Sequence, residues 1–222
     1  MNQPSPTELL VLNATAAYVC DTLTGESSGH DWWHVWRVRN YARVIHANEG
    51  GDLYIIELAA LLHDIADYKL HGGNEDLGPE RAAQWLYGQQ VAAPIVDHVC
   101  TIIKELDFKG AHVETALSSL EGRVVHDADK LDAIGAIGIA RAFAYGGTFN
   151  RVLHDPAITP VMHTSFEAYK TAKGTTINHF YEKLLLIPDR MKTETGKTLA
   201  KERGMYIKAF LDRFNDEWRG AK

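Results

Sequence analysis

A histidine and an aspartate stand together at the end of an apolar run. Residues 57–67 read Glu-Leu-Ala-Ala-Leu-Leu-His-Asp-Ile-Ala-Asp, so His63 and Asp64 follow a stretch of core-type residues. Ala and Leu dominate the run and β-branched residues are few, which predicts a helix rather than a strand. An imidazole or a carboxylate buried without a partner costs several kcal/mol. A divalent metal would satisfy both groups, because each is a ligand of such ions.

The His-Asp pair does not identify a site by itself, since it occurs at 30–31, 63–64, 126–127 and 154–155. The last of these precedes Pro156 in a segment without helical period, which indicates an exposed loop. Asp31 stands where it would cap the next helix. Only His63 and Asp64 follow a buried helix, so we favour this pair as the metal site.

A second candidate ligand is His34. On a helix expected over 31–48, it shares one face with Val38, Tyr41 and Ile45, so its imidazole should point inward. A single inward histidine is more often a core residue than a ligand. The metal interpretation of His34 therefore depends on the other candidates.

The third candidate is Asp129, within an acidic run at 126–132. The run interrupts an otherwise apolar helical pattern, and Asp129 shares a face with Val125 and Ala133, which places it toward the core. Asp127 is rotated from it by about 200° at helical spacing. The alternative, a solvated charged face, is disfavoured by the small and apolar flanking residues.

Two imidazoles and two carboxylates from three helices form a hard-to-intermediate ligand set. Such a set suits Mn, Fe, Co, Ni, Zn or Mg with open positions for water. A closed structural zinc site would use thiolates instead. The only cysteines, Cys20 and Cys100, have no paired spacing, which indicates reduced thiols and a cytoplasmic protein.

Composition narrows the class of protein further. The chain has 222 residues and a net charge of −6, which argues against general nucleic-acid binding. No apolar run approaches membrane-spanning length, and the N-terminus lacks a signal-peptide pattern. We therefore expect neither a nucleic acid nor a membrane as partner.

The elements that must position these residues are all expected to be helices. Helical patterns cover residues 7–23, 31–48, 52–64, 80–89, 94–106, 121–145, 175–186 and 198–218. No alternating strand pattern of useful length occurs. We predict an all-α, single-domain bundle over 1–222, with a metal-binding core at 31–145 and C-terminal helices at 165–219 packed on it. The aperiodic stretch 148–164 is a candidate lid.

The order of His34, His63-Asp64 and Asp129 resembles the H…HD…D pattern of HD-domain metal-dependent phosphohydrolases. The resemblance covers about 31–145. Further motifs are similar to small stand-alone bacterial HD hydrolases, some of which resemble nucleoside-triphosphate pyrophosphohydrolases: Gly-His-Asp-Trp-Trp-His at 29–34, Leu-Leu-His-Asp-Ile-Ala-Asp at 61–67, Asp-Phe-Lys-Gly at 107–110 and Asp-Ala-Asp-Lys-Leu-Asp-Ala-Ile-Gly-Ala at 127–136.

The resemblance implies one divalent ion held by four ligands, His34, His63, Asp64 and Asp129. Manganese is favoured over nickel, cobalt, magnesium, zinc and iron. The resemblance also makes Asp67, three residues after the HD aspartate, the candidate acid/base. Members with two metals carry extra histidines that this chain lacks, which disfavours two-metal phosphodiesterase and oxygenase activities.

Phosphoryl transfer needs positive charge around the phosphate oxygens. Arg37 and Lys109 are the catalytic candidates, and Lys69 and Lys130 are candidates for substrate binding; an ordinary surface charge is the alternative for each. Trp33 and Tyr145 could stack on a base, although such aromatics more often belong to a core.

The resemblance implies a hydrolase that cleaves (deoxy)nucleoside triphosphates to monophosphate and pyrophosphate. A nucleoside monophosphate phosphatase and a non-catalytic nucleotide sensor on the same fold are the alternatives. The sequence leaves a homodimer open.

Overall fold

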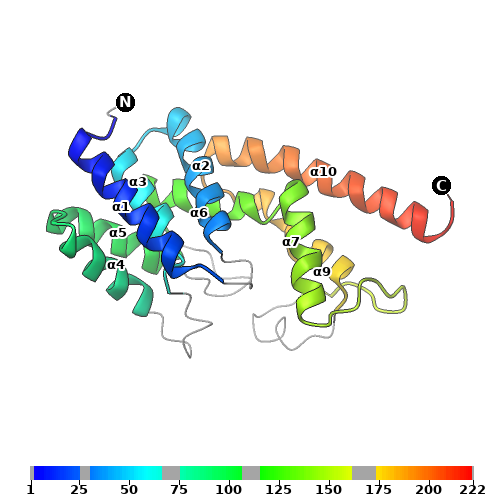
Figure 1. The fold of residues 1–222 in the computed structure, drawn as a ribbon. Coiled ribbons are helices and arrows are strands. Elements are labelled where there is room, and N and C mark those ends of the chain that lie inside the picture. The colour runs from blue at the N-terminus through cyan, green and yellow to red at the C-terminus, as the bar shows by residue number, and fades with distance from the viewer. Residues whose placement is uncertain (1–2, 26–30, 67–75, 107–115, 162–173, 222) are drawn as a thin grey trace. The chain divides into compact units, whose positions relative to one another are not determined.

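The computed structural model describes residues 3–25, 31–66, 76–106, 116–161 and 174–221. Within these ranges the regular structure is helical and no strand occurs, which confirms the all-α prediction (Figure 1). None of the helices found there is long and apolar enough to cross a membrane. The α-helices are α1 (Pro6–Thr22), α2 (Trp32–Glu49), α3 (Leu53–Leu62), α4 (Leu77–Gly88), α5 (Ala93–Leu106), α6 (Leu120–Asp132), α7 (Gly135–Thr148), α9 (Thr176–Glu182) and α10 (Glu194–Trp218).

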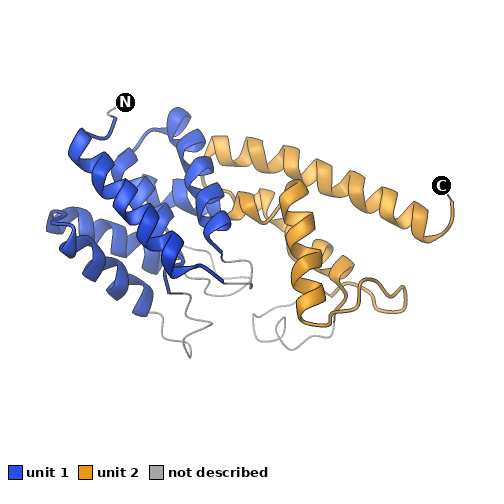
Figure 2. Ribbon diagram, viewed as in Figure 1, with its two compact units in different colours: residues 1–108, 114–129 blue, residues 109–113, 130–222 orange. Residues whose placement is uncertain are grey.

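The chain forms two compact units (Figure 2). Unit 1 comprises Met1–Phe108 and Glu114–Asp129, and unit 2 comprises Lys109–Val113 and Lys130–Lys222. The metal-ligand candidates all belong to unit 1. A single domain over 1–222, with the C-terminal helices packed on the core, stays a prediction.

Helix α3 is the centre of unit 1. All ten of its residues are buried, because it packs against α1, α2 and α5. The neighbouring helices contribute aliphatic side chains to this core, among them Leu12, Val19, Val35, Val38, Ile45, Val99 and Ile102. The helix on which the predicted metal site depends is therefore held from several sides.

Local caps fix where the helices of unit 1 begin. The Asp31 carboxylate accepts the backbone N–H of His34 at 2.8 Å, as the sequence predicts for this cap. Asp52 caps α3 in the same way by accepting from Tyr54 and Ile55. Ser5 and Glu8 form a capping box at α1.

The prediction of a single helix over 121–145 is wrong, because α6 ends at Asp132 and α7 begins at Gly135. Gly135 has φ +77°, a left-handed conformation that a helix interior does not allow. Two arginines bind the last carbonyl groups of α6: the Arg203 guanidinium donates to the Leu131 carbonyl, and the Arg141 guanidinium donates to the Asp132 carbonyl and carboxylate. These bonds satisfy the end of α6 in place of a continuing helix.

Unit 2 is built on α7, α9 and α10. Phe143, Phe180 and Phe210, one from each helix, have ring centroids 5.8–6.0 Å apart. Two short 3₁₀ turns, Leu184–Leu186 and Pro188–Arg190, separate α9 from α10. Helix α10 begins at Glu194 rather than 198, because Thr193 caps it by accepting from the Gly196 N–H at 2.9 Å.

The candidate lid at 148–164 is described only to residue 161. Residues 151–161 are not helical. The segment is tied to the start of α9 by the N–H groups of Thr176 and Ile177, which donate to the Val152 and Leu153 carbonyls at 2.9 and 3.1 Å. A lid function stays a prediction.

Candidate metal centre

Helix α2 delivers His34 to the interior of unit 1. The Asp31 cap starts the helix one turn before His34, and Val38 and Ile45 bury the same face. The His34 side chain is 1% exposed. The inward orientation expected from the helical period is confirmed.

The turn after α3 delivers His63 and Asp64. His63 is the C-cap of the helix, and its Nδ1 lies 2.9 Å from the Ala60 carbonyl oxygen. Since a carbonyl can only accept, Nδ1 carries the proton and Nε2 is left to the interior. Nε2 is thus the atom of His63 that can bind a metal.

Helix α6 delivers Asp129 from a third direction. Val124, Val125 and Ala128 of the same helix are buried, whereas the Asp129 side chain keeps 25% exposure. The carboxylate therefore lies at the edge of the core, where an ion and its water could reach it. Neighbouring Asp127 is fully buried and hydrogen-bonds the His126 Nδ1 at 2.9 Å, so it takes no part in the cluster described below.

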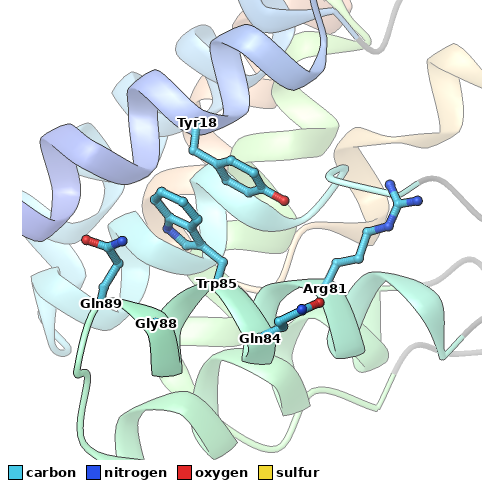
Figure 3. A pocket seen from close by; sticks show the side chains of 6 residues that line it. All are labelled: Tyr18, Arg81, Gln84, Trp85, Gly88 and Gln89. Atoms are coloured by element: carbon cyan, nitrogen blue, oxygen red, sulfur yellow. The ribbon is translucent and has the colours of Figure 1, made fainter.

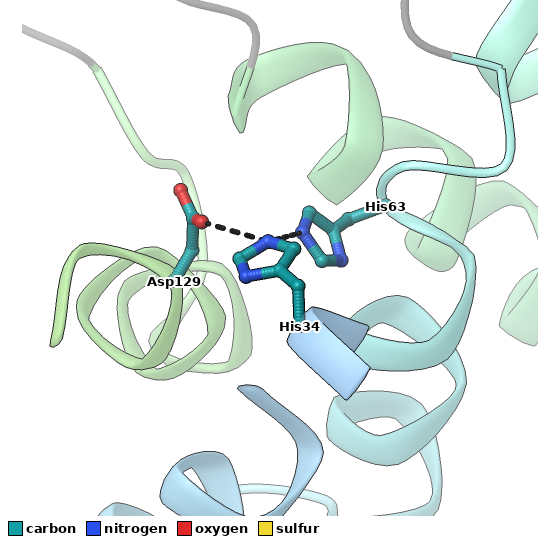
Figure 4. Close-up of side chains that lie close together, drawn as sticks. All are labelled: His34, His63 and Asp129. Atoms are coloured by element: carbon teal, nitrogen blue, oxygen red, sulfur yellow. Dashed lines mark hydrogen bonds and ion pairs between the residues drawn. The ribbon is translucent and has the colours of Figure 1, made fainter. Parts of the chain in front are cut away.

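Ligand-type atoms of His34, His63 and Asp129 converge from these three elements (Figure 4), and Asp64 lies close to both histidines. The His34 Nε2 lies 3.3 Å from the His63 Nε2, 3.3 Å from the Asp64 Oδ2 and 3.5 Å from the Asp129 Oδ1. The His63 Nε2 lies 3.4 Å from the Asp64 Oδ2. We call these four residues the HHDD cluster.

The ligand atoms of His34, His63 and Asp129 all lie within 4.8 Å of one another, so these three residues could hold one cation, and the Asp64 Oδ2 lies within 3.4 Å of both histidine nitrogens. Two ligand atoms that each lie about 2.1 Å from one ion are about 3.0–3.4 Å apart in octahedral or tetrahedral geometry. The His34 Nε2 also carries at most one proton, so it cannot donate to another ring nitrogen and to two carboxylates at once. A divalent ion would satisfy all four groups together.

The electrostatics of the metal-free cluster place a proton on His63. Burial lowers the pKa of this imidazole, but the charge and hydrogen bond of Asp64, the charge of Asp129 and the Ala60 carbonyl raise it, to about 9. Two carboxylates thus attract positive charge strongly at this point. A metal ion would take the place of that proton.

Comparisons with known proteins show which family this chain resembles. The HD domain model matches residues 32–134. The "Uncharacterized protein YpgQ" of Bacillus subtilis is 36% identical over 215 residues, which is 96% of each chain.

The chain belongs to the HD-domain family.

Solved structures agree in fold over nearly the whole chain. An HD-superfamily hydrolase of Bacillus thuringiensis is similar with a TM-score of 0.77 and 38% identity, covering 96% of this chain and 98% of that one. Bacillus subtilis YpgQ in complex with ADP is similar with a TM-score of 0.77 and 33% identity, covering 95% and 96%. The protein thus has the fold of the HD-superfamily hydrolases, and its cluster could hold a divalent metal.

An ion-pair cluster that was not predicted from the sequence joins α2 to α3 in this HD protein. We call its residues, Glu57, Arg39 and Arg43, the Glu57 clamp. Glu57 of α3 is 2% exposed, and it accepts from the Arg39 Nε at 2.6 Å and from the Arg43 Nε at 2.9 Å, both on α2. Burial lowers the pKa of the Arg39 guanidinium, and Glu57 opposes this effect. The signal in the sequence was a lone carboxylate within an apolar helix.

The other predicted site residues of the HD protein have varied positions. Arg37 and Trp33 lie on α2 within one turn of His34; Arg37 is half-buried and Trp33 is 59% exposed. Lys130 follows Asp129 directly and is half-buried. All three are close in sequence to His34 or Asp129, and their roles toward a substrate stay predictions.

Tyr145 lies on α7 of unit 2, and its ring is 4.4 Å from that of Phe149 and 5.8 Å from the Arg151 guanidinium. Asp67, Lys69 and Lys109 lie outside the described residues. Helix α3 ends at Leu62, and residues 63–66 form turns.

Proposed function

We propose that this HD-family protein is a metal-dependent hydrolase that cleaves nucleoside triphosphates to the monophosphate and pyrophosphate. The observation that carries the proposal is the convergence of four ligand atoms from α2, the turn after α3, and α6 within 3.3–3.5 Å of the His34 Nε2 or the His63 Nε2. Manganese is the ion we favour.

The residues of the cluster would hold the ion in an arrangement that already exists. His34, His63, Asp64 and Asp129 would each supply one atom, and the Ala60 carbonyl fixes the tautomer of His63. A bound divalent ion supplies charge for phosphate oxygens and lowers the pKa of a water molecule. The 25% exposure of Asp129 marks the side from which substrate would enter.

The remaining residues would bind the phosphates and move protons. Arg37 would pair its planar guanidinium with phosphate oxygens, and Lys69, Lys109 and Lys130 would neutralise the polyphosphate. In the reaction, a water oxygen bonds to the α-phosphorus, and the bond from that phosphorus to the bridging oxygen breaks. Asp67 would accept a proton from the attacking water and could then donate that proton to the leaving pyrophosphate.

A nucleotide is the favoured substrate because Bacillus subtilis YpgQ, which this chain resembles, is known in complex with ADP. Trp33, with 59% of its surface exposed beside His34, would offer a ring for the base. Tyr145 is the second aromatic candidate.

Product analysis tests this proposal. Purified protein is incubated with nucleoside tri-, di- and monophosphates and Mn, Mg, Co or Ni, and pyrophosphate and orthophosphate are assayed separately. We expect pyrophosphate and the monophosphate in equal amounts from triphosphates. Release of orthophosphate from monophosphates would instead identify a nucleotidase. If no product forms with any metal, the remaining alternative is a non-catalytic nucleotide sensor.

A further inference from the structure

A groove on unit 1 lies between α1 and α4 and shares no residue with the HHDD cluster. It encloses about 330 Å³ and is lined by Tyr18, Arg81, Gln84, Trp85, Gly88 and Gln89 (Figure 3). The α4 residues recur every three or four positions, so they form one face of that helix. The volume is at the small end of the range for small-molecule sites, about 300–1,000 Å³.

The aromatic wall of the groove is already ordered. The rings of Tyr18 and Trp85 are stacked, with centroids 4.0 Å apart and an interplanar angle of 5°. The Trp85 Nε1–H donates to the Oγ1 of buried Thr15 at 3.0 Å, which fixes the orientation of the indole. A ligand ring that extends this stack would not have to immobilise either side chain.

The polar groups of the groove suit a ring with an anionic substituent. Arg81 is half-buried, and it forms no ion pair with another residue of the described ranges, so its guanidinium is available to an anion. The Gln84 and Gln89 side chains each offer an amide donor and an acceptor. A glutamine amide can pair with the N6/N7 edge of adenine through two hydrogen bonds.

The floor of the groove is open at Gly88. A Cβ added there would meet no atom within 4 Å, although Gly88 is the last residue of α4. A larger residue at position 88 would fill the groove without displacing the core.

We propose that this groove binds a purine nucleoside monophosphate. The stacked rings would accept the base face, the glutamine amides its edge, and Arg81 the single phosphate. The small volume and the single guanidinium favour a monophosphate over a triphosphate. The proposal does not depend on the proposed hydrolysis, because the groove and the cluster have no residue in common.

The experiment is an NMR titration of the metal-free, ¹⁵N-labelled full chain with AMP. The Gly88 backbone amide, the side-chain amides of Gln84 and Gln89 and the Trp85 indole N–H report on the groove. We expect AMP to shift these signals with an affinity at least about tenfold higher than that of adenosine or inorganic phosphate, because only AMP has both the ring and the charge.

Matched variants assign the binding to the groove. Arg81→Gln should weaken AMP binding about tenfold, to the level of adenosine, whereas Arg190→Gln at an exposed arginine of unit 2 should not. Gly88→Leu should abolish the shifts. Gly147→Leu is its control, since Gly147 is also in the last turn of a helix with no atom within 4 Å of an added Cβ.

Three results would overturn the proposal: AMP leaves the groove signals unchanged, AMP and adenosine bind equally, or Arg81→Gln binds AMP as the parent does. Circular dichroism checks that each variant is folded. If Gly88→Leu does not fold, the Arg81→Gln titration and the adenosine comparison still decide. Shifts confined to residues around His34 and His63 would place AMP at the metal centre and also refute the groove.

Discussion

The two nitrogens of His63 have different tasks. Its Nδ1 donates to the Ala60 carbonyl at 2.9 Å, which leaves Nε2 for the cluster, 3.3 Å from the His34 Nε2. The sequence predicted this residue because an imidazole after a buried helix needs a partner. The tautomer could not be predicted, because it depends on the turn that follows α3.

The pKa of His63 gives the metal-free protein a pH-dependent stability. Its pKa rises from 6.5 in the unfolded chain to about 9 in the folded one, so the folded state retains a proton that the unfolded chain loses. The stabilisation is complete below pH 6.5 and is lost as the pH rises through about 9. Urea unfolding should therefore show a free energy of unfolding that decreases over this interval, and His63→Ala should reduce the decrease. An equal slope in both proteins would contradict the pKa.

Removing a ligand should abolish metal binding and hydrolysis together. We expect His63→Ala and Asp64→Ala to lose bound manganese and all hydrolysis above background, measured by metal analysis and product assay on the same preparations. Asp155→Ala, which alters another His-Asp pair outside the cluster, is the control and should retain both. Full turnover by either cluster variant would exclude the site.

At the scale of helices, the Glu57 clamp joins α2 to α3, and we expect it to position His34 relative to His63. Glu57→Gln removes the charge but keeps the volume, and leaves Arg39 buried beside Arg43 without a carboxylate. Breaking a buried pair costs about 3–5 kcal/mol, and we expect about 3 because Arg43 is 44% exposed and can be rehydrated. Manganese affinity should fall about tenfold, as for other supporting contacts of metal ligands.

Urea unfolding and manganese titration measure these two effects. Glu194→Gln is the matched control, because Glu194 forms an exposed ion pair with Lys197 and should cost less than about 1 kcal/mol. Unchanged manganese affinity in folded Glu57→Gln would mean that the clamp stabilises the fold without positioning the histidines.

The helices differ in how far the sequence predicted them. The starts of α2 and α3 were predicted because Asp31 and Asp52 cap them through neighbouring residues. The break between α6 and α7 was missed: Gly135, with φ +77°, is its local signal, whereas Arg203, which binds the Leu131 carbonyl, lies 72 residues away. Local chemistry is readable in the sequence, whereas a distant partner for a helix end is not.

At the scale of the molecule, the metal cluster was predictable and the substrate contacts were not. His34, His63, Asp64 and Asp129 share an order and spacing with the HD pattern, and unit 1 brings them together. Trp33 lies on α2 but is 59% exposed, so the packing that predicts an inward His34 does not fix the position of its ring. Tyr145 lies on α7 of unit 2, and its role in binding a base stays a prediction.

Metal binding should also stabilise the folded protein as a whole. An ion that binds only the folded state raises the free energy of unfolding by about 2.7 kcal/mol at a free concentration of 100 times its Kd. We expect this increase when manganese is added, its reversal by a chelator, and no increase in Asp129→Asn. The measurement is urea unfolding at fixed pH, and equal stability with and without manganese would contradict a bound ion.

The central claim is that three elements of unit 1 hold one cation between them. Anomalous diffraction from a crystal soaked in manganese tests it most directly. We predict one strong peak between the His34 Nε2, the His63 Nε2, the Asp64 Oδ2 and the Asp129 Oδ1. No peak there, with all four side chains ordered and manganese bound elsewhere or nowhere, would contradict it.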